Sequence, residues 1–258
     1  MDYAVLVGIN AYQYPNALNG CLNDVADIKG ELIAALSFAP SSILELTDAG
    51  ATAQSIKQSL SACVGQLKSG DRFLFWYSGH GDQLNNGAAS TDVICPIDYN
   101  FTVDSSVTVS DFHSIFSKIP DGVDAFWGSD SCHSGDLERD MHRQGVPRQY
   151  RRNPASFVPP PPPKTFARFR DISAGLPNIV LMSGCRSDQT SADAYISDRY
   201  NGAFTHFFVQ TIQAPNGLGT PLSALLPEIQ AALQAGGYPQ IPQLSGRPTA
   251  LQADFMQP

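Results

Sequence analysis

Short apolar runs alternate with amphipathic segments along most of the 258-residue chain. Apolar runs between turn-forming residues are typical of buried strands, and apolar residues at every third or fourth position indicate helices. This pattern predicts strands at 3–9, 43–46, 72–78, from 123, at 178–182 and at a sheet edge over 240–244. It predicts helices at 22–36, 52–67, 110–118, 202–212 and 222–233, and a hairpin within 83–98. Strands that alternate with helices imply an α/β fold with a mostly parallel sheet and helices on both faces.

Two of the apolar runs end in chemically reactive side chains. The run from Arg72 leads into Ser78-Gly79-His80-Gly81, and the run from Val123 leads into Asp130-Ser131-Cys132-His133-Ser134-Gly135. Open α/β sheets keep their sites at the carboxyl ends of the strands. We therefore expect the two strands to be neighbours, so that His80 faces Cys132.

A thiol paired with an imidazole indicates nucleophilic catalysis, because attack requires a thiolate or a base that generates one. Glycines beside His80 permit a sharp turn and close approach of a substrate chain. The backbone N–H groups of Gly81 and Cys132 are candidates to bind an oxyanion. His133 competes with His80 for the role of base, but neighbours on a strand point to opposite faces, which favours a supporting role for His133.

Two alternatives accompany this hypothesis. Cys132 and His80 could be ordinary residues at strand ends, although both follow apolar strands and both stand in turns of glycine and serine. They could also bind zinc with His133, but no further ligand follows at a regular spacing. The sequence therefore favours a cysteine nucleophile over a metal site.

The charge of the chain is unevenly distributed. Residues 1–138 carry a net charge of -12, whereas residues 139–170 carry +7 and hold 8 of the 16 Lys and Arg residues. Regular patterning stops between 136 and 176, where the prolines at 159–163 favour an extended polyproline segment. We interpret this stretch as a basic linker that interrupts one sheet. The acidic remainder of the chain could bind this linker.

Overall composition excludes several classes of protein. The net charge of -8 disfavours nucleic acid as a partner. No apolar run approaches the roughly 18 residues that a membrane span needs, and a strand so close to Met1 leaves no room for a signal peptide. The five cysteines are scattered without a CxxC pair, which favours a reducing, cytoplasmic location over a disulfide framework.

The motifs at 77–81 and 130–135 resemble the catalytic motifs of metacaspases and bacterial orthocaspases, which are caspase-like cysteine peptidases. Further similar stretches follow in the same order at 7–10, 20–25, 183–193, 202–205 and 240–244. The resemblance implies a caspase-like three-layer αβα sandwich with a central sheet of about six strands. It implies a single domain over 1–258, similar to type I metacaspases but without a prodomain. Within this domain, 1–138 resembles the large caspase subunit, 139–176 is the linker and 177–258 resembles the small subunit.

The resemblance also implies a Cys132–His80 dyad and cleavage after Arg or Lys. The primary pocket of the family corresponds here to Asp24 and Asp130, with Cys21 and Ser78 completing its wall. Two carboxylates suit a guanidinium, which they bind through charge-assisted, bidentate hydrogen bonds. The simpler alternatives are that Asp24 caps a helix and that Asp130 is a solvated charge at a strand end.

Several expectations follow from the family pattern. The calcium-binding aspartates of many metacaspases correspond here to Thr91, Val109, Ser110 and Arg139, which are poor ligands for a hard cation. Asp92, Asp98, Asp104 and Asp111 stand nearby, yet we expect activity without calcium or another cofactor. We also expect a monomer, self-processing in the linker, and protein or peptide substrates with Arg or Lys at the cleavage site. A non-catalytic module that binds basic segments through the same pocket is the alternative function.

Overall fold

A six-stranded sheet forms the centre of the protein in this computed structural model. The structure describes residues 1–13, 16–85, 89–131, 149–150, 165–167, 169, 176, 178–186 and 189–256. The strand order is β13-β10-β7-β3-β1-β2. The strands are β1 (Asp2–Gly8), β2 (Ile43–Thr47), β3 (Arg72–Ser78), β7 (Asp124–Asp130), β10 (Val180–Ser183) and β13 (Gln243–Ser245). Only β13, at one edge, runs antiparallel to its neighbour in this sheet, which confirms the predicted mostly parallel arrangement.

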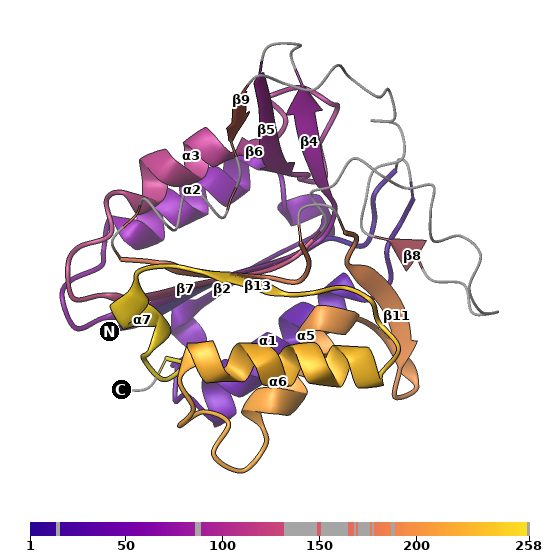
Figure 1. The fold of residues 1–258 in the computed structure, drawn as a ribbon. Helices are drawn as coiled ribbons and strands as arrows, with labels where there is room; N and C mark the ends of the chain where they lie inside the picture. Colours follow the sequence, from indigo (N-terminus) through magenta and orange to yellow (C-terminus); the bar gives the residue numbers. More distant parts are fainter. Residues whose placement is uncertain are drawn as a thin grey trace.

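Helices cover both faces of this sheet and give the predicted three layers (Figure 1). One face is covered by α2 (Ala53–Val64) and α3 (Val109–Phe116). The other is covered by α1 (Cys21–Ala34), α5 (Ala203–Ile212) and α6 (Leu222–Ala235). Alternation along β3 places Phe73, Phe75 and Tyr77 in the first core and Leu74 and Trp76 in the second.

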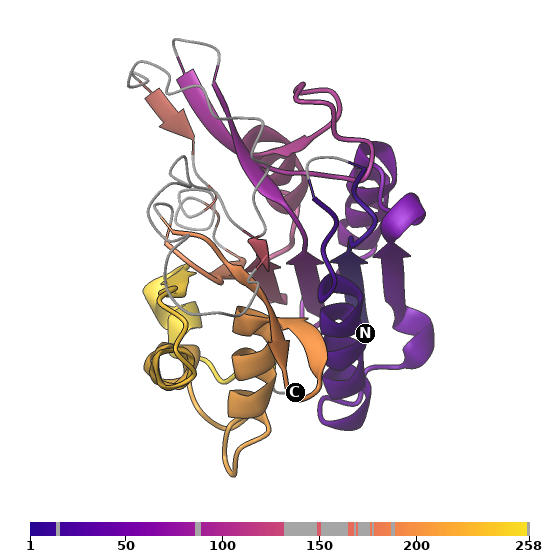
Figure 2. The ribbon, with the colours of Figure 1, turned by 90° about the vertical axis from the view of Figure 1, so that its right-hand side faces the viewer.

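Two smaller sheets adjoin the central one. The first contains β4 (Gly81–Asn85), β5 (Ala89–Ile94), β6 (Val107–Thr108) and β9 (Thr165–Ala167). The second contains β12 (Arg199–Gly202), β11 (Ala192–Ile196) and β8 (Gln149–Tyr150). The predicted hairpin is β4–β5, which stands beyond the end of the central sheet toward which its parallel strands point (Figure 2). The short elements are η1 (Pro40–Ser42), η2 (Asp48–Gly50) and α7 (Pro248–Leu251).

Several element boundaries differ from those predicted. Thr52 caps α2, but the helix ends at Val64, with Gly65 as its C-cap residue, and not at 67 as predicted. Thr108 begins α3 earlier than predicted, since its side chain and that of Asp111 form a reciprocal capping box. The last long helix starts at Leu222 as predicted, contains Pro227, and extends two residues further, to Ala235. The part of the chain that the structure describes contains no helix long and apolar enough to cross a membrane.

A missing side chain on β7 allows the strands and α5 to pack closely. Gly128 pairs with Trp76, and a Cβ atom at Gly128 would lie 2.1 Å from the indole ring. The indole therefore lies flat over the strand and stacks on Phe204 of α5 at a centroid distance of 5.8 Å. This packing fixes the first turn of α5 beneath the carboxyl ends of β3 and β7.

An arginine at the opposite end of β3 links distant segments. The guanidinium of Arg72 donates two hydrogen bonds to the Asp2 carboxylate, at 2.8 and 2.9 Å. It also donates to the carbonyl oxygens of Leu36 and Met256, and it lies 4.7 Å from the centre of the Phe38 ring. These contacts hold the amino end of the sheet both to the loop that follows α1 and to the C-terminal segment.

This ion pair predicts a loss of stability in acid. The hydrogen bonds from Arg72 lower the pKa of the Asp2 carboxyl below its ordinary value. A carboxyl whose pKa is lower in the folded than in the unfolded protein stabilises the fold above its unfolded pKa of about 4, and this contribution is lost as the pH falls through the folded pKa. We expect Asp2→Asn to reduce the free energy of unfolding by about 1 kcal/mol at pH 7 and by much less at pH 3. Urea titrations at the two pH values measure this difference, with the exposed Asp104→Asn as the control. A loss of unfolding free energy in Asp2→Asn that is equal at pH 7 and pH 3 would contradict the prediction.

Candidate active site

His80 occupies the turn between the central sheet and the β4–β5 hairpin. β3 ends at Ser78, and Gly81 begins β4, so the chain changes sheets within two residues. The imidazole is 1% exposed. Gly79 is required beside it, because a Cβ atom there would lie 2.5 Å from the Tyr12 hydroxyl and 2.6 Å from that of Tyr77. The sequence correctly placed His80 at the carboxyl end of a buried strand.

One contact defines the protonation of the His80 ring. Its Nε2 atom lies 2.8 Å from the carbonyl oxygen of Asn16. A carbonyl oxygen can only accept, so Nε2 carries the proton and Nδ1 is the basic nitrogen of the neutral ring. The tautomer thus follows from the neighbouring carbonyl group. This arrangement suits a general base that acts through Nδ1.

The strand that leads to Cys132 lies beside the strand that leads to His80. β3 and β7 pair in parallel with Ser78 opposite Asp130, and the Gly79 N–H donates to the Asp130 carbonyl at 3.4 Å. The predicted adjacency of the two strand ends is confirmed. Ser131 is the last described residue of this segment and is fully buried. Cys132 and His133 lie outside the described residues, so their predicted roles stay predictions.

Asp24 lies in the first turn of α1 and is fully buried. Its Oδ2 atom accepts a hydrogen bond from the Ser78 hydroxyl at 2.5 Å. Its Oδ1 atom accepts from the Gly202 N–H at 2.8 Å and the Asn201 side-chain amide at 3.2 Å. The helix-cap alternative is wrong, because Gly20 is the N-cap residue of α1.

Asp130 is also fully buried, at the end of β7. The Ser191 hydroxyl donates to its Oδ1 atom at 2.5 Å. The Thr205 hydroxyl and N–H donate to its Oδ2 atom at 2.7 and 2.9 Å. Asp130 is therefore not a solvated charge. The donors to both carboxylates named here are neutral, so they orient the carboxylates without cancelling their charge.

Ser78 connects the two acidic residues. It pairs with Asp130 across the sheet, and its hydroxyl group donates to Asp24. Cys21 begins α1, one turn before Asp24, and is fully buried in the core cluster that also contains Tyr12 and Tyr77. The structure thus places Ser78, which binds Asp24, directly beside Asp130 on the neighbouring strand, with Cys21 at the start of the same helix as Asp24.

Sequence reasoning missed two polar residues beside this group. Asp193 is fully buried and accepts from the backbone N–H groups of Asn19 and Gly20 at 2.8 and 2.9 Å, which anchors the segment before α1. Asn201 is also fully buried, and its amide nitrogen bridges Asp24 and Asp27. Asp193 stood in a stretch already quoted for the family resemblance. No sequence pattern marked Asn201, because its role depends on β12 packing against α1.

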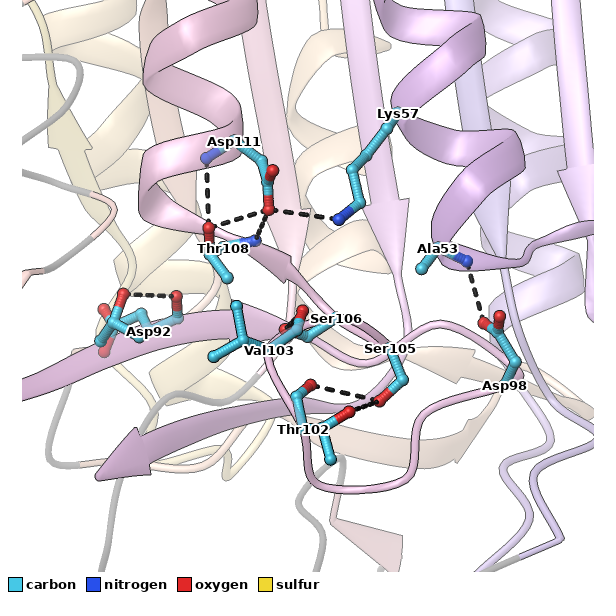
Figure 3. A network of polar contacts seen from close by, with 11 residues as sticks. Ala53, Lys57, Asp92, Asp98, Thr102, Val103, Ser105, Ser106, Thr108 and Asp111 are labelled. Carbon is cyan, nitrogen blue, oxygen red and sulfur yellow. Dashed lines mark hydrogen bonds and ion pairs between the residues drawn. The ribbon is translucent and has the colours of Figure 1, made fainter. Parts of the chain in front are cut away.

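The aspartates near the expected calcium positions serve as caps and tethers (Figure 3). Asp111 accepts from the Thr108 N–H and from Lys57 at 3.4 Å, and Asp98 accepts from the Ala53 N–H at the start of α2. Asp92 accepts from the Gln83 side chain at 3.0 Å. Within the described ranges, no three His, Cys, Asp or Glu side chains are grouped so that they could hold a metal ion.

Comparison with known proteins agrees with this geometry. The caspase domain family matches residues 1–251, so the chain belongs to that family of cysteine peptidases. It is metacaspase-like: it is 28% identical to Metacaspase-1 of Arabidopsis thaliana, over 91% of this chain and 65% of the relative. It is 30% identical to Metacaspase-2 of Trypanosoma brucei brucei, over 94% of this chain and 72% of the relative. The chain thus spans about two thirds to three quarters of the length of these relatives.

Solved structures show the same fold. A protein from Geobacter sulfurreducens superposes with a TM-score of 0.72 at 21% identity, over 99% of this chain and 98% of the other. Caspase-1 from Spodoptera frugiperda superposes with a TM-score of 0.61 at 11% identity, over 95% of this chain and 86% of the other. The predicted caspase-like fold is confirmed.

Proposed function

We propose that residues 1–258 act as one peptidase domain, a cysteine endopeptidase that hydrolyses peptide bonds after Arg or Lys. The observation that carries this proposal is the pair of buried carboxylates beside the strand ends that lead to His80 and Cys132. Asp130 ends β7, and Asp24 accepts a hydrogen bond from Ser78, the residue opposite Asp130 on β3. Such a pair selects a cation, and the neighbouring motif residues supply a nucleophile and a base.

The reaction follows the usual course of thiol acyl transfer. His80 Nδ1 takes the proton of the Cys132 thiol, and the thiolate attacks the carbonyl carbon of the substrate. The N–H groups of Gly81 and Cys132 bind the resulting oxyanion. The intermediate collapses when the protonated His80 gives its proton to the leaving amine, and water then hydrolyses the thioester with His80 again as base.

The charge of the pocket determines which residue precedes the cleaved bond. A guanidinium presents a planar array of donors that can reach both carboxylates at once, whereas an ammonium acts as a point charge. We therefore expect cleavage after Arg to be faster than cleavage after Lys. We also expect the two buried carboxylates to repel an Asp side chain at this position of the substrate.

A set of fluorogenic peptides that differ only in the residue before the reporter tests this function. We expect the Arg peptide to be hydrolysed fastest, Lys more slowly, and Ala and Asp peptides at least about a hundredfold more slowly than Arg. The result against it is preferred cleavage after Asp or Ala.

The non-catalytic alternative retains the pocket without the chemistry. The polar group around Asp24 and Asp130 would bind a basic peptide segment whether or not Cys132 reacts. Calorimetry with an Arg peptide, combined with an assay for its hydrolysis, distinguishes the two functions. If the wild type binds the peptide but never hydrolyses it, the non-catalytic binding module is favoured.

We propose that the basic linker at 139–176 is cleaved by the enzyme itself. The linker contains 8 Lys and Arg residues, and the rest of the chain is acidic, so the two attract each other. The wild type should separate into two fragments cut after an Arg or Lys of the linker, whereas Cys132→Ala should stay intact. Intact-mass spectrometry after incubation measures this. A wild type that hydrolyses peptides but remains whole would contradict it.

We further propose that activity needs no calcium. Thr91, Val109, Ser110 and Arg139 provide no cluster of carboxylates, and the nearby Asp98 and Asp111 are engaged as helix caps. Turnover of an Arg peptide should change by less than about twofold between millimolar calcium and excess EGTA. Loss of turnover in EGTA that added calcium restores would overturn this expectation.

Cysteine content and net charge also bear on the compartment and the partners of the protein. The five cysteines are scattered along the sequence without a CxxC pair, which suits a reducing compartment such as the cytoplasm. The acidic net charge favours basic protein or peptide substrates over nucleic acid. We propose a monomer that acts away from membranes.

A further inference from the structure

Two buried tyrosine hydroxyls bind the backbone of His80 from both sides. The His80 N–H donates to the Tyr12 hydroxyl at 3.0 Å, and the Tyr77 hydroxyl donates to the His80 carbonyl at 2.5 Å. Tyr12 follows β1, and Tyr77 belongs to β3. The His80 carbonyl also accepts from the Cys95 N–H at 2.9 Å. The His80 N–H is therefore held by a residue 68 positions earlier in the chain, and the His80 carbonyl by the strand that precedes it and by the Cys95 segment.

The carbonyl oxygen of Cys95 lies within hydrogen-bond distance of both hydroxyls, at 2.9 Å from Tyr12 and 3.0 Å from Tyr77. Tyr12 donates to the Cys95 carbonyl at 2.9 Å, which leaves its lone pair for the His80 N–H, and the two phenol oxygens lie 3.2 Å apart. Burial raises the pKa of both phenols well above the ordinary value. Both hydroxyls therefore keep their protons at neutral pH.

The Tyr12 ring also restricts the imidazole directly. The two ring centres lie 4.4 Å apart with an interplanar angle of 53°. Together with the contact between Nε2 and the Asn16 carbonyl, this packing limits rotation of the His80 side chain. Gly79 is part of the same arrangement, because any side chain there would displace both hydroxyls.

We propose that Tyr12 and Tyr77 are positioning residues that hold His80 Nδ1 in line with the Cys132 thiol. This inference rests on the proposed function of His80 as base. A base displaced by a fraction of an ångström loses much of its effect, and supporting hydrogen bonds maintain such geometry. The tyrosines act through His80 and need not contact the substrate, so their loss should lower kcat and leave KM nearly unchanged.

Tyr12→Phe and Tyr77→Phe test this directly, because phenylalanine keeps the ring and removes only the hydroxyl. Tyr99→Phe is the matched control: Tyr99 is a half-buried phenol that donates to Asp82 at 2.9 Å and not to His80. We expect kcat for an Arg peptide to fall at least about tenfold in each test variant, with KM within about twofold, and the control to keep wild-type kcat. Circular dichroism and thermal unfolding establish that the variants compared are folded.

A second readout is independent of turnover. In the protein labelled with ¹⁵N at histidine, the His80 ring resonances, assigned with His80→Gln, should shift or broaden in both test variants and remain unchanged in Tyr99→Phe. Wild-type kcat together with unmoved His80 resonances in the folded test variants would overturn the proposal. If the wild type itself hydrolyses no peptide, the proposed function fails, and the resonances alone decide whether the hydroxyls position His80.

Discussion

Replacing either Cys132 or His80 with alanine should abolish hydrolysis of an Arg peptide, with kcat reduced at least about a thousandfold. Without Cys132 there is no nucleophile, and without His80 no group at the strand end takes the thiol proton. The structure supports this expectation through the pairing of β3 with β7 and through the Asn16 contact that leaves Nδ1 as the basic nitrogen. Initial rates at saturating substrate measure it, with thermal unfolding as evidence of a native fold.

Two further histidine variants make this test specific. His113→Ala changes an exposed position on α3 and should keep wild-type activity. His133→Ala distinguishes the two candidate bases: activity retained in His133→Ala and lost in His80→Ala assigns the base to His80. The opposite pattern, or more than about a tenth of wild-type activity in His80→Ala, would contradict the assignment.

Replacing Asp24 or Asp130 with asparagine should remove most of the preference for arginine. Among the described residues, three neutral groups donate to each carboxylate, so an asparagine of the same shape loses the negative charge and turns an N–H group toward those donors. We expect kcat/KM for an Arg peptide to fall about a hundredfold or more in each variant, because charge-assisted bonds to a buried carboxylate are lost.

A peptide with citrulline in place of arginine isolates the charge, since citrulline has nearly the same shape and is neutral. The wild type should strongly prefer the Arg peptide, and the asparagine variants should hydrolyse the two peptides at similar rates. Asp98→Asn is the control, because it weakens the cap of α2 and should leave the preference intact. An Arg-to-citrulline ratio that stays at the wild-type value in the folded Asp24→Asn and Asp130→Asn proteins would contradict the proposed pocket.

Local patterns in the sequence were sufficient for the order of elements and for the meeting of the two strand ends. The central residues of β3 and β7 are apolar, polar residues follow them, and this contrast is visible without any knowledge of packing. The edge strand at 240–244 was also predicted, although it is shorter and lies at Gln243–Ser245. Boundaries were less certain because caps such as Gly65 and Thr108 depend on which of several competing residues binds the helix end.

The supporting residues of the site could not be predicted in the same way. Tyr12 lies in an irregular segment with no periodic pattern, and its contact with His80 exists only because β1 lies beside β3. Asn201 and Asp193 come from the β11–β12 hairpin, which reaches α1 from a distant part of the sequence. Such residues are selected by tertiary packing, so spacing along the chain carries little information about them.

Intact-mass spectrometry of the protein treated with a thiol-reactive ketone that carries an arginine side chain tests the central claim most directly. The wild type should gain the mass of one inhibitor, located on Cys132 by peptide mapping, whereas Cys132→Ala and the matched aspartate-bearing ketone should give no adduct. Labelling at another of the five cysteines, or equal labelling by the two ketones, would contradict a nucleophilic Cys132 beside an acidic pocket.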